Sequence, residues 1–380
     1  MPRESWKDKI LFTPGPLTTS PAVKTAMLRD LGARDADFLK IVLDVKKRLL
    51  DLAEVDGDKY TVVLMQGCGS MGVEAAVGCA VPKKGGKLLV AINGAYGKRI
   101  SDMARVMNMP VETLDYPENA PVKPEDVGER LKNDDGITHV AMVHCETASG
   151  IFNPVKEVGK IVSKRKRVFI VDAMSSFGAA EIKIDKWDIR WLVSSANKCV
   201  EGVPGFSFVI VENKALAASA GNARSLCLDL HAQNEDMRRN GQFRYTPPVH
   251  AVLAFHRALL ELEAEGGVEA RMKRYRRNCR TLREGMAELG FEEYLAPDDH
   301  GWIITSFRYP RNTAFSFDNF YNLLRDDGFV IYPGKVDNAD LFRVGNVGRI
   351  APSDVSCLID AMRRSLAKMG VAMAPGKIPE

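Results

Sequence analysis

The sequence predicts an α/β protein in which a large domain holds a mostly parallel sheet of seven strands and a smaller α+β domain follows it. Up to Val211, short apolar runs alternate with helical patterns. Strands that are apolar throughout are typical of a parallel sheet covered by helices on both faces. The pattern changes after residue 250, and the 380 residues exceed the ~250–300 at which one hydrophobic core stops growing.

Seven apolar runs of strand length account for the sheet of the large domain. They are Tyr60–Met65, Lys87–Ile92, Val111–Leu114, His139–Val143, Val168–Val171, Trp191–Val193 and Phe206–Val211. Helical patterns lie between most of these runs, as at Ser70–Val81, Gly97–Met107 and Pro124–Lys132. This alternation predicts crossover helices between neighbouring parallel strands.

A different order of elements follows the sheet. A helix over Val249–Glu265 is predicted to end at Gly266-Gly267, and another begins near Val268. Further elements are strands near Trp302–Phe307, Phe329–Ile331 and Leu341–Val344, and a last helix over Pro352–Met369. We therefore expect a large domain of residues 17–265 and a small domain of residues 1–16 and 266–380.

Composition and charge exclude several classes of protein. The net charge is only +4, so no overall field favours nucleic acid or a membrane surface. The basic stretch Arg271–Arg283 has apolar residues at helical spacing and predicts an amphipathic helix with a solvated basic face. No apolar run approaches the ~20 residues of a membrane span, and the charged start Met1–Ile10 does not resemble a signal peptide.

Cysteine and histidine spacing predicts neither disulfides nor a metal site. The seven cysteines show no paired spacing, and the six histidines show no ligand spacing. Reduced thiols in a cytoplasmic protein are the simplest interpretation.

A glycine-rich loop follows the first strand of the sheet. Residues 66–72 read Gln-Gly-Cys-Gly-Ser-Met-Gly and precede a helix, which predicts a cup for a phosphate at the helix N-terminus. The same string matches the dinucleotide fingerprint. That interpretation needs an acidic residue about 20 positions later, where the chain has Ala91-Ile92-Asn93-Gly94. An NAD-dependent dehydrogenase therefore stays only a distant alternative.

Asp172 and Lys198 stand at the ends of two neighbouring apolar runs. Burying an unpaired charge is costly, so Asp172 needs a cationic partner. Pyridoxal 5′-phosphate (PLP) would use both residues, since its aldehyde binds a lysine amine and its protonated ring nitrogen pairs with a carboxylate. An ordinary Asp–Lys ion pair is the alternative interpretation.

The chain resembles the class V aminotransferases, a family of PLP-dependent transferases of fold type I, over nearly its whole length. The segments that carry the resemblance are 11–16, 93–97, 144–147, 172–178, 194–198, 202–206, 332–335 and 342–346. The segments around Asp172 and Lys198 are the most specific to the family.

The resemblance implies a role for each matching residue. Lys198 would bind the cofactor aldehyde and move protons, and Asp172 would pair with the ring nitrogen. Cys68, Gly69 and Ser70 would bind the cofactor phosphate. Tyr96 and Met174 would lie against the two ring faces, and the Thr147 hydroxyl near the ring oxygen. Thr246 would reach the phosphate of a neighbouring subunit, which implies a homodimer with shared active sites, and Arg343 would bind the acidic group of the substrate.

The forms Ser194–Lys198 and Tyr332–Lys335 resemble the branch that transfers the amino group of 2-aminoethylphosphonate to pyruvate in phosphonate catabolism. An alanine– or serine–glyoxylate aminotransferase remains the alternative, because a carboxylate could use the same lysine, aspartate and arginine. Arg34 and Arg244 are further candidates for holding the phosphonate. Two positions depart from the expected pattern: Cys68 replaces a serine, and Ala148 replaces a second hydroxyl.

Overall fold

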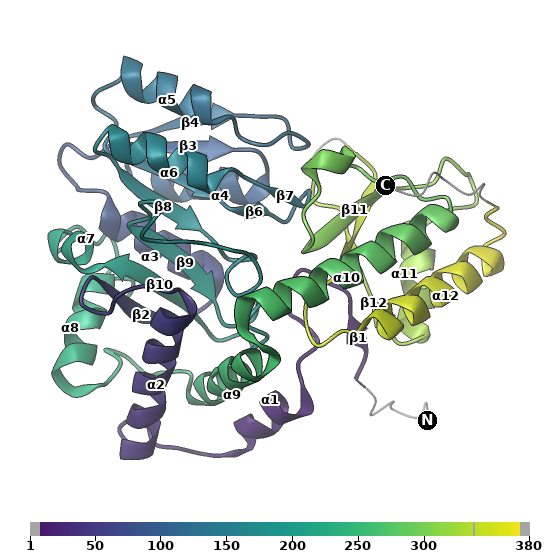
Figure 1. Ribbon diagram of the computed structural model, residues 1–380, viewed down its shortest axis with the longest axis horizontal. Coiled ribbons are helices and arrows are strands. Elements are labelled where there is room, and N and C mark those ends of the chain that lie inside the picture. The colour runs from purple at the N-terminus through teal and green to yellow at the C-terminus, as the bar shows by residue number, and fades with distance from the viewer. Residues whose placement is uncertain (1–7, 337–338, 373–380) are drawn as a thin grey trace.

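The computed structural model describes residues 8–336 and 339–372. Figure 1 shows a large α/β part and a smaller part joined by the long helix α10 (Gly267–Glu288). The smaller part holds the C-terminal elements together with the first strand, β1 (Ile10–Leu11). The division at residues 16/17 and 265/266 stays a prediction.

A seven-stranded sheet forms the centre of the large part, in the order β2-β10-β9-β8-β5-β3-β4. Its strands are β2 (Tyr60–Gln66), β3 (Leu88–Ile92), β4 (Val111–Asp115), β5 (His139–Val143), β8 (Val168–Asp172), β9 (Trp191–Ser195) and β10 (Phe206–Glu212). Only β10 runs against its neighbours. The expectation of a mostly parallel sheet of seven strands is confirmed, and each predicted run lies within one residue of an observed strand or inside it.

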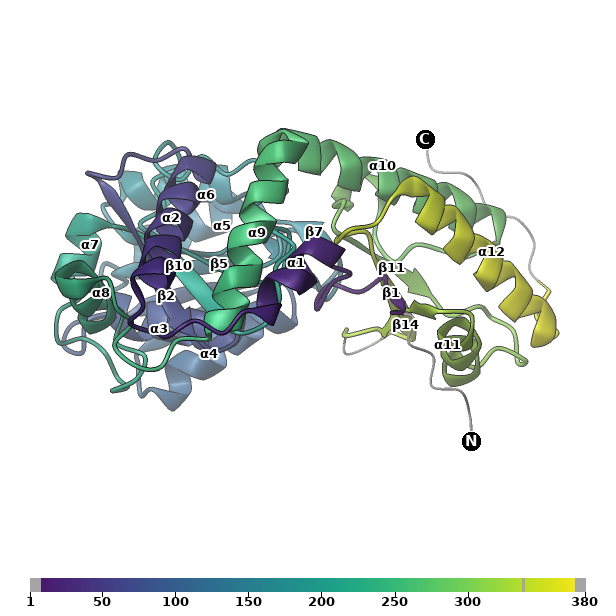
Figure 2. The same ribbon diagram turned by 90° about the horizontal axis from the view of Figure 1, so that it is seen from below.

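Helices cover both faces of this sheet, as the continuous apolar strands require. One core packs residues of α2 (Ala36–Leu52), α5 (Pro124–Asn133), α6 (Val155–Lys164) and α9 (Val249–Glu265) against the sheet. The other packs residues of α3 (Gly69–Ala80), α4 (Ala95–Val106) and α7 (Asn213–Ala218). Figure 2 shows α2, α9 and the short α1 (Pro21–Thr25) together on one side. The remaining elements are η1 (Ala26–Leu28), α8 (Leu230–Asn240), η2 (Pro297–Asp299) and the hairpin β6 (Cys145–Glu146) and β7 (Ile151–Phe152).

The small part packs α10, α11 (Phe317–Asp326) and α12 (Pro352–Lys368) around an aromatic core. Its antiparallel sheet has the order β11-β14-β13, formed by β11 (Ile304–Arg308), β14 (Leu341–Gly345) and β13 (Tyr332–Pro333). The single strand expected near Phe329–Ile331 is instead two short strands. The first, β12 (Phe329–Val330), pairs with β1, whereas β13 pairs with β14.

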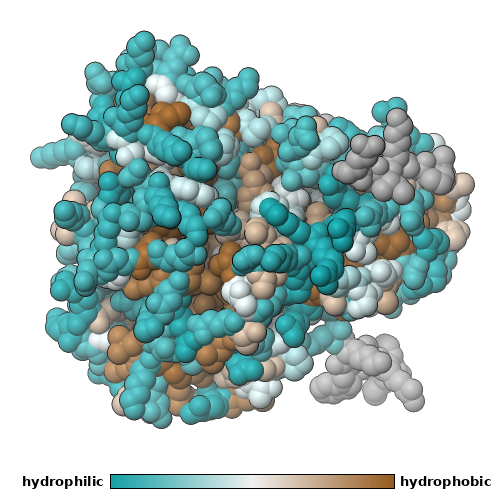
Figure 3. Space-filling model, in the orientation of Figure 1, coloured by the Kyte–Doolittle hydropathy of each residue, from teal (hydrophilic) through white to brown (hydrophobic). Residues whose placement is uncertain are grey.

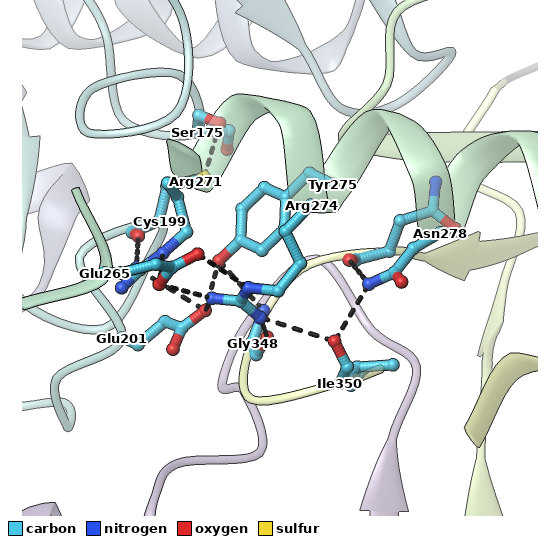
Figure 4. Close-up of polar contacts among 11 residues, drawn as sticks. Ser175, Cys199, Glu201, Glu265, Arg271, Arg274, Tyr275, Asn278, Gly348 and Ile350 are labelled. Atoms are coloured by element: carbon cyan, nitrogen blue, oxygen red, sulfur yellow. Dashed lines mark hydrogen bonds and ion pairs between the residues drawn. The ribbon is translucent and has the colours of Figure 1, made fainter. Parts of the chain in front are cut away.

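A buried polar network ties α10 to the turn that follows β9 (Figure 4). Arg271, 1 % exposed, donates to the Cys199 carbonyl oxygen at 2.6 Å and to Glu265 at 2.8 Å. Arg274 and Tyr275 both donate to Glu201, at 2.7 and 2.6 Å. Because buried charges are stable only when paired and hydrogen-bonded, this network fixes the turn against the helix.

Within the described ranges, no helix combines the length and apolar character needed to cross a bilayer. All seven cysteines fall in these ranges, and each is free.

Candidate functional site

A cavity of about 400 Å³ lies where β8, β9 and the loop before α3 end. Its size is typical of a small-molecule site. Seven of the ten residues expected at the site line it: Cys68, Gly69, Ser70, Tyr96, Asp172, Met174 and Lys198. Carboxyl ends of parallel strands meet at one edge of a sheet, which is where open α/β sheets bind ligands.

Asp172 and Lys198 reach the cavity from adjacent strands. Asp172 is the last residue of β8 and is paired with Val193 of β9. Lys198 follows β9 by three residues, and its Nζ donates to the Pro14 carbonyl oxygen at 3.0 Å. Burial lowers the pKa of Lys198, against the opposing effects of Tyr96 and Asp172. A lowered pKa favours a neutral amine, which can act as a nucleophile or a base.

The Asp172 carboxylate is 6 % exposed and accepts one hydrogen bond, from the Met174 N–H at 2.9 Å. It forms no ion pair with any residue of the described chain. Burial raises its pKa to about 6, although Lys198 and Arg99 oppose the shift. A buried carboxylate without a cationic partner at a cavity wall fits a ligand that brings its own positive charge, such as a protonated pyridine nitrogen.

The start of α3 lines the cavity at the position where a phosphate cup was expected. Cys68 is the N-cap residue, and its side chain makes no capping hydrogen bond. In the described chain no acceptor is paired with the backbone N–H of Gly69 or Ser70. Free N–H groups and the helix dipole together favour a phosphate. A Cβ on Gly69 would lie 2.5 Å from the Met174 sulfur, so glycine lets Met174 pack beside the cup.

Arg99 joins this cup, which was not predicted. It lies one turn after Tyr96 on α4, and its Nη1 donates to the Ser70 hydroxyl at 2.9 Å. Its guanidinium also lies over the Tyr96 ring, 4.9 Å from the centroid. The only sequence signal was the spacing of three residues from Tyr96, which places both side chains on one side of a helix.

Thr147 and Arg343 do not line this cavity, but both contact Tyr96. Arg343 of β14 is 6 % exposed and donates to two backbone carbonyls, from Nε to Pro333 at 3.0 Å and from Nη1 to Thr147 at 2.9 Å. Burial would raise the pKa of Tyr96, but Lys335, Lys198, Arg343 and a hydrogen bond with Thr147 lower it below its usual value.

Glu146 is a buried acid that sequence reasoning assigned no role. Its two carboxylate oxygens accept hydrogen bonds from the backbone N–H groups of Tyr96, Gly97 and Ala148, at 3.0–3.3 Å. Burial raises the pKa of Glu146 to about 7, and these donors only partly offset the effect. The segment 144–147 was part of the family resemblance, but nothing in its amino-acid sequence indicated that the Glu146 side chain accepts hydrogen bonds at the start of α4.

Three other arginine and threonine candidates lie away from the cavity. Thr246 is exposed, and its backbone carbonyl is near the Gln66 side-chain amide at 3.3 Å. Arg34 is exposed on a turn, and Arg244 donates to the Leu226 carbonyl oxygen. Their roles stay predictions.

Comparisons with known proteins agree with this geometry. The sequence profile described as "Aminotransferase class-V" matches residues 21–328. The chain is 48 % identical over 358 residues to the 2-aminoethylphosphonate–pyruvate transaminase of Bacillus cereus. The aligned residues cover 94 % of this chain and 98 % of that protein. The chain is 48 % identical over 362 residues to the enzyme of the same name from Syntrophobacter fumaroxidans, over 95 % of this chain and 97 % of that one.

A bifunctional phosphonoacetaldehyde hydrolase/aminoethylphosphonate transaminase of Clostridioides difficile is 45 % identical, and the chain spans only 56 % of its length. Among solved structures, the ureidoglycine–glyoxylate aminotransferase of Bacillus subtilis superimposes with a TM-score of 0.89, at 22 % identity over 99 % of this chain and 97 % of that one. This likeness shows the fold.

Proposed function

Because the chain belongs to the class V aminotransferases, we propose that it moves the amino group of 2-aminoethylphosphonate to pyruvate, giving phosphonoacetaldehyde and L-alanine. The donor carbon is oxidised from amine to aldehyde, and the ketone carbon of pyruvate is reduced to an amine. The observation that carries the proposal is that Lys198 and Asp172 line the same cavity, together with relatives of that name at 48 % identity.

The enzyme uses PLP, and the cavity residues fit it. When bound, PLP supplies an electron sink for negative charge at the reacting carbon. The carboxylate of Asp172 would pair with the ring nitrogen, and the start of α3 with Arg99 would hold the phosphate. Tyr96 and Met174 would hold the ring between them.

Lys198 would remove and return the proton at the reacting carbon. Its Nζ is partly buried and donates to the Pro14 carbonyl oxygen, and its lowered pKa leaves a larger share of the amine neutral. A base with a pKa close to the working pH transfers protons most efficiently.

Arg343 would bind the acidic group of the substrate. Two of its nitrogens are fixed on the carbonyls of Pro333 and Thr147, so the guanidinium is held in one orientation. Burial lowers the pKa of Arg343 and so disfavours its charged form. No carboxylate of the described chain forms an ion pair with Arg343 that would offset this effect. The planar fork suits a carboxylate or a phosphonate.

An alanine– or serine–glyoxylate aminotransferase remains the second candidate, since a carboxylate donor could bind the same Arg343. The family assignment leaves no support for the NAD-dependent dehydrogenase considered from the glycine motif.

A panel of amino donors tests the proposal. Cofactor-loaded enzyme is mixed with 2-aminoethylphosphonate, alanine or serine, each against pyruvate and glyoxylate, and Lys198→Ala is the control without turnover. We expect the 2-aminoethylphosphonate–pyruvate pair to have the highest kcat/KM and to form alanine. A higher kcat/KM for serine or alanine with glyoxylate would overturn the proposal in favour of the second candidate.

We further propose a homodimer that shares its active sites and works in the cytoplasm. Exposed apolar side chains on the large part support an interface; they are Leu28, Leu43, Met71, Val106, Leu226 and Tyr245. Figure 3 likewise shows apolar surface among the hydrophilic side chains of this part. The seven free cysteines agree with a reducing compartment.

A further inference from the structure

We propose that Lys335 is the second cation that binds the phosphonate of the donor, and that it selects a phosphonate over a carboxylate. This inference rests on the proposed function and adds a specificity residue to it. Lys335 belongs to the segment Tyr332–Lys335, to which sequence reasoning gave no individual role.

The charge of the donor requires more than Arg343. A phosphonate carries up to two negative charges on three oxygens, whereas a carboxylate carries one charge on two oxygens. One arginine fork satisfies a carboxylate. A doubly charged phosphonate removed from water needs a second positive group, because an unpaired buried charge is costly.

Four cations lie around Tyr96 and the cavity, and three of them have another partner or task. Lys198 is needed at the reacting carbon. Arg99 donates to Ser70 in the phosphate cup. Arg343 is the first acid-binding group. Lys335 forms no ion pair within the part of the chain that the structure describes, and its charge lowers the pKa of Tyr96 more than any other nearby group.

Arg343 of β14 and Lys335, two residues after the neighbouring strand β13, both lie near the same tyrosine. The Lys335 Nζ lies 4.4 Å from the centroid of the Tyr96 ring. Arg343 is close enough to help lower the pKa of Tyr96. The two cations are tied together, because Tyr332 pairs with Arg343 across β13 and β14, and the Pro333 carbonyl accepts from Arg343. They can therefore approach one acidic group together.

The length of the donor favours a cation further out than Arg343. In 2-aminoethylphosphonate the phosphorus is two bonds from the reacting carbon, whereas in alanine the carboxylate is one bond away. Lys335 does not line the cavity that holds Lys198. It lines an adjoining cavity of about 680 Å³, and Arg99 lines both. A longer acidic substituent would extend toward this second space.

Kinetics with paired substrates test the proposal. Lys335→Met and Lys335→Arg are compared with wild type, using 2-aminoethylphosphonate and its carboxylate counterpart β-alanine as donors. Lys98→Met is the matched control, since Lys98 is an exposed lysine of the same outer cavity. We expect Lys335→Met to lower kcat/KM for the phosphonate by about 10- to 150-fold, the range for a charge-assisted contact. The loss for β-alanine should be at least tenfold smaller, and Lys335→Arg should restore most of the phosphonate activity.

Binding without turnover provides the second readout. Calorimetric titration of cofactor-loaded enzyme with ethylphosphonate and with propanoate should show that Lys335→Met weakens only the former by tenfold or more. Equal losses for the two ligands, or an equal loss in Lys98→Met, would overturn the proposal. If wild type does not accept 2-aminoethylphosphonate, the proposed function fails, whereas the ethylphosphonate titration still decides whether Lys335 binds a phosphonate.

Discussion

Asp172 and Glu146 are two buried carboxylates that the same fold uses differently. Asp172 receives one backbone N–H and faces the cavity. Glu146 receives three and stands at the start of α4, which carries Tyr96 and Arg99. A negative charge near a helix N-terminus is favourable. Glu146 therefore positions the start of the helix that carries Tyr96 and Arg99, whereas Asp172 lies at the cavity with a single backbone donor.

Replacing Glu146 with Gln should change how stability depends on pH. The pKa of Glu146 is raised from 4.5 to about 7 in the folded chain. Between these values the folded chain binds a proton that the unfolded chain releases, so this group makes stability fall as pH rises. The shift corresponds to at most roughly 3 kcal/mol. Urea unfolding of the cofactor-free chain should show that the free energy of unfolding of Glu146→Gln rises relative to that of wild type, by up to that amount, between pH 5 and pH 8.

Parallel stability curves for the two proteins over this range would show that Glu146 stays ionised. Glu157 is an acid of the first turn of α6 that lies outside the site, so Glu157→Gln is the control. It should leave the slope of wild type unchanged.

Residues at strand ends were the most predictable part of the site. Asp172 and Lys198 follow apolar runs, and the geometry of parallel strands brings such positions to one edge. Arg99 and Lys335 were not predicted. The contact of Arg99 with Ser70 depends on how α4 packs beside α3, and the contact of Lys335 with Tyr96 depends on how the segment after β13 packs against α4. Sequence spacing could not predict the contact between Lys335 and the Tyr96 ring, because the two residues are far apart in sequence and lie in different parts of the molecule.

At the scale of elements, α10 connects the turn after Lys198 to the small part. Its first turns carry Arg271 and Arg274, which hold Cys199 and Glu201, and its last turns pack Leu282 and Met286 in the small core. Glu201 adopts a left-handed backbone conformation with φ of 67°, which is uncommon for a residue other than glycine. The network of Figure 4 stabilises this conformation three residues after Lys198.

Replacing Arg271 with Met should destabilise the protein strongly. The substitution leaves the Cys199 carbonyl without its donor and removes a cation from Glu201 and Glu265. Breaking a buried ion pair on one side costs about 3–5 kcal/mol. Urea unfolding should show a loss of that size.

The exposed Arg277 of the same helix provides the control, because Arg277→Met should change stability by only about 0.5 kcal/mol. Similar losses in the two variants would contradict a special role for the network.

Short strands limited the prediction of elements. Residues 329–331 form one apolar run, yet Phe329–Val330 pairs with Ile10–Leu11 while Tyr332–Pro333 pairs with β14. A two-residue strand such as β1 has no periodicity of its own. Its position depends on pairing across more than 300 residues of chain, which no local pattern contains.

At the scale of the whole molecule, the N-terminal segment packs against Lys198. Pro14 accepts the hydrogen bond from the lysine, and a Cβ on Gly15 would lie 2.7 Å from Nζ. Gly15 has φ of 127°, which other residues rarely adopt. The next residues lead back to α1 on the large part, so this segment joins the two parts beside Lys198.

The proposed dimer would build each active site from both of its chains. Thr246 does not line the cavity of its own chain. If it completes the partner's phosphate cup, each site takes Lys198 from one chain and Thr246 from the other, as a symmetric pair allows. Lys198→Ala should be inactive, and Thr246→Asp should be inactive because its charge repels a phosphate. A mixed dimer of the two variants holds one site with both native residues.

Equal mixing with subunit exchange should therefore restore about a quarter of wild-type activity, since half of the dimers are mixed and each has one good site. If Thr246 served its own chain, every site in the mixed dimer would lack either the lysine or the threonine, and no activity would return. Mixing Lys198→Ala with Asp172→Asn is the control for exchange without a shared site, because both residues belong to one chain's cavity. That pair should recover nothing beyond the residual activity of Asp172→Asn. A fully active monomer by light scattering at assay concentration would exclude the shared site altogether.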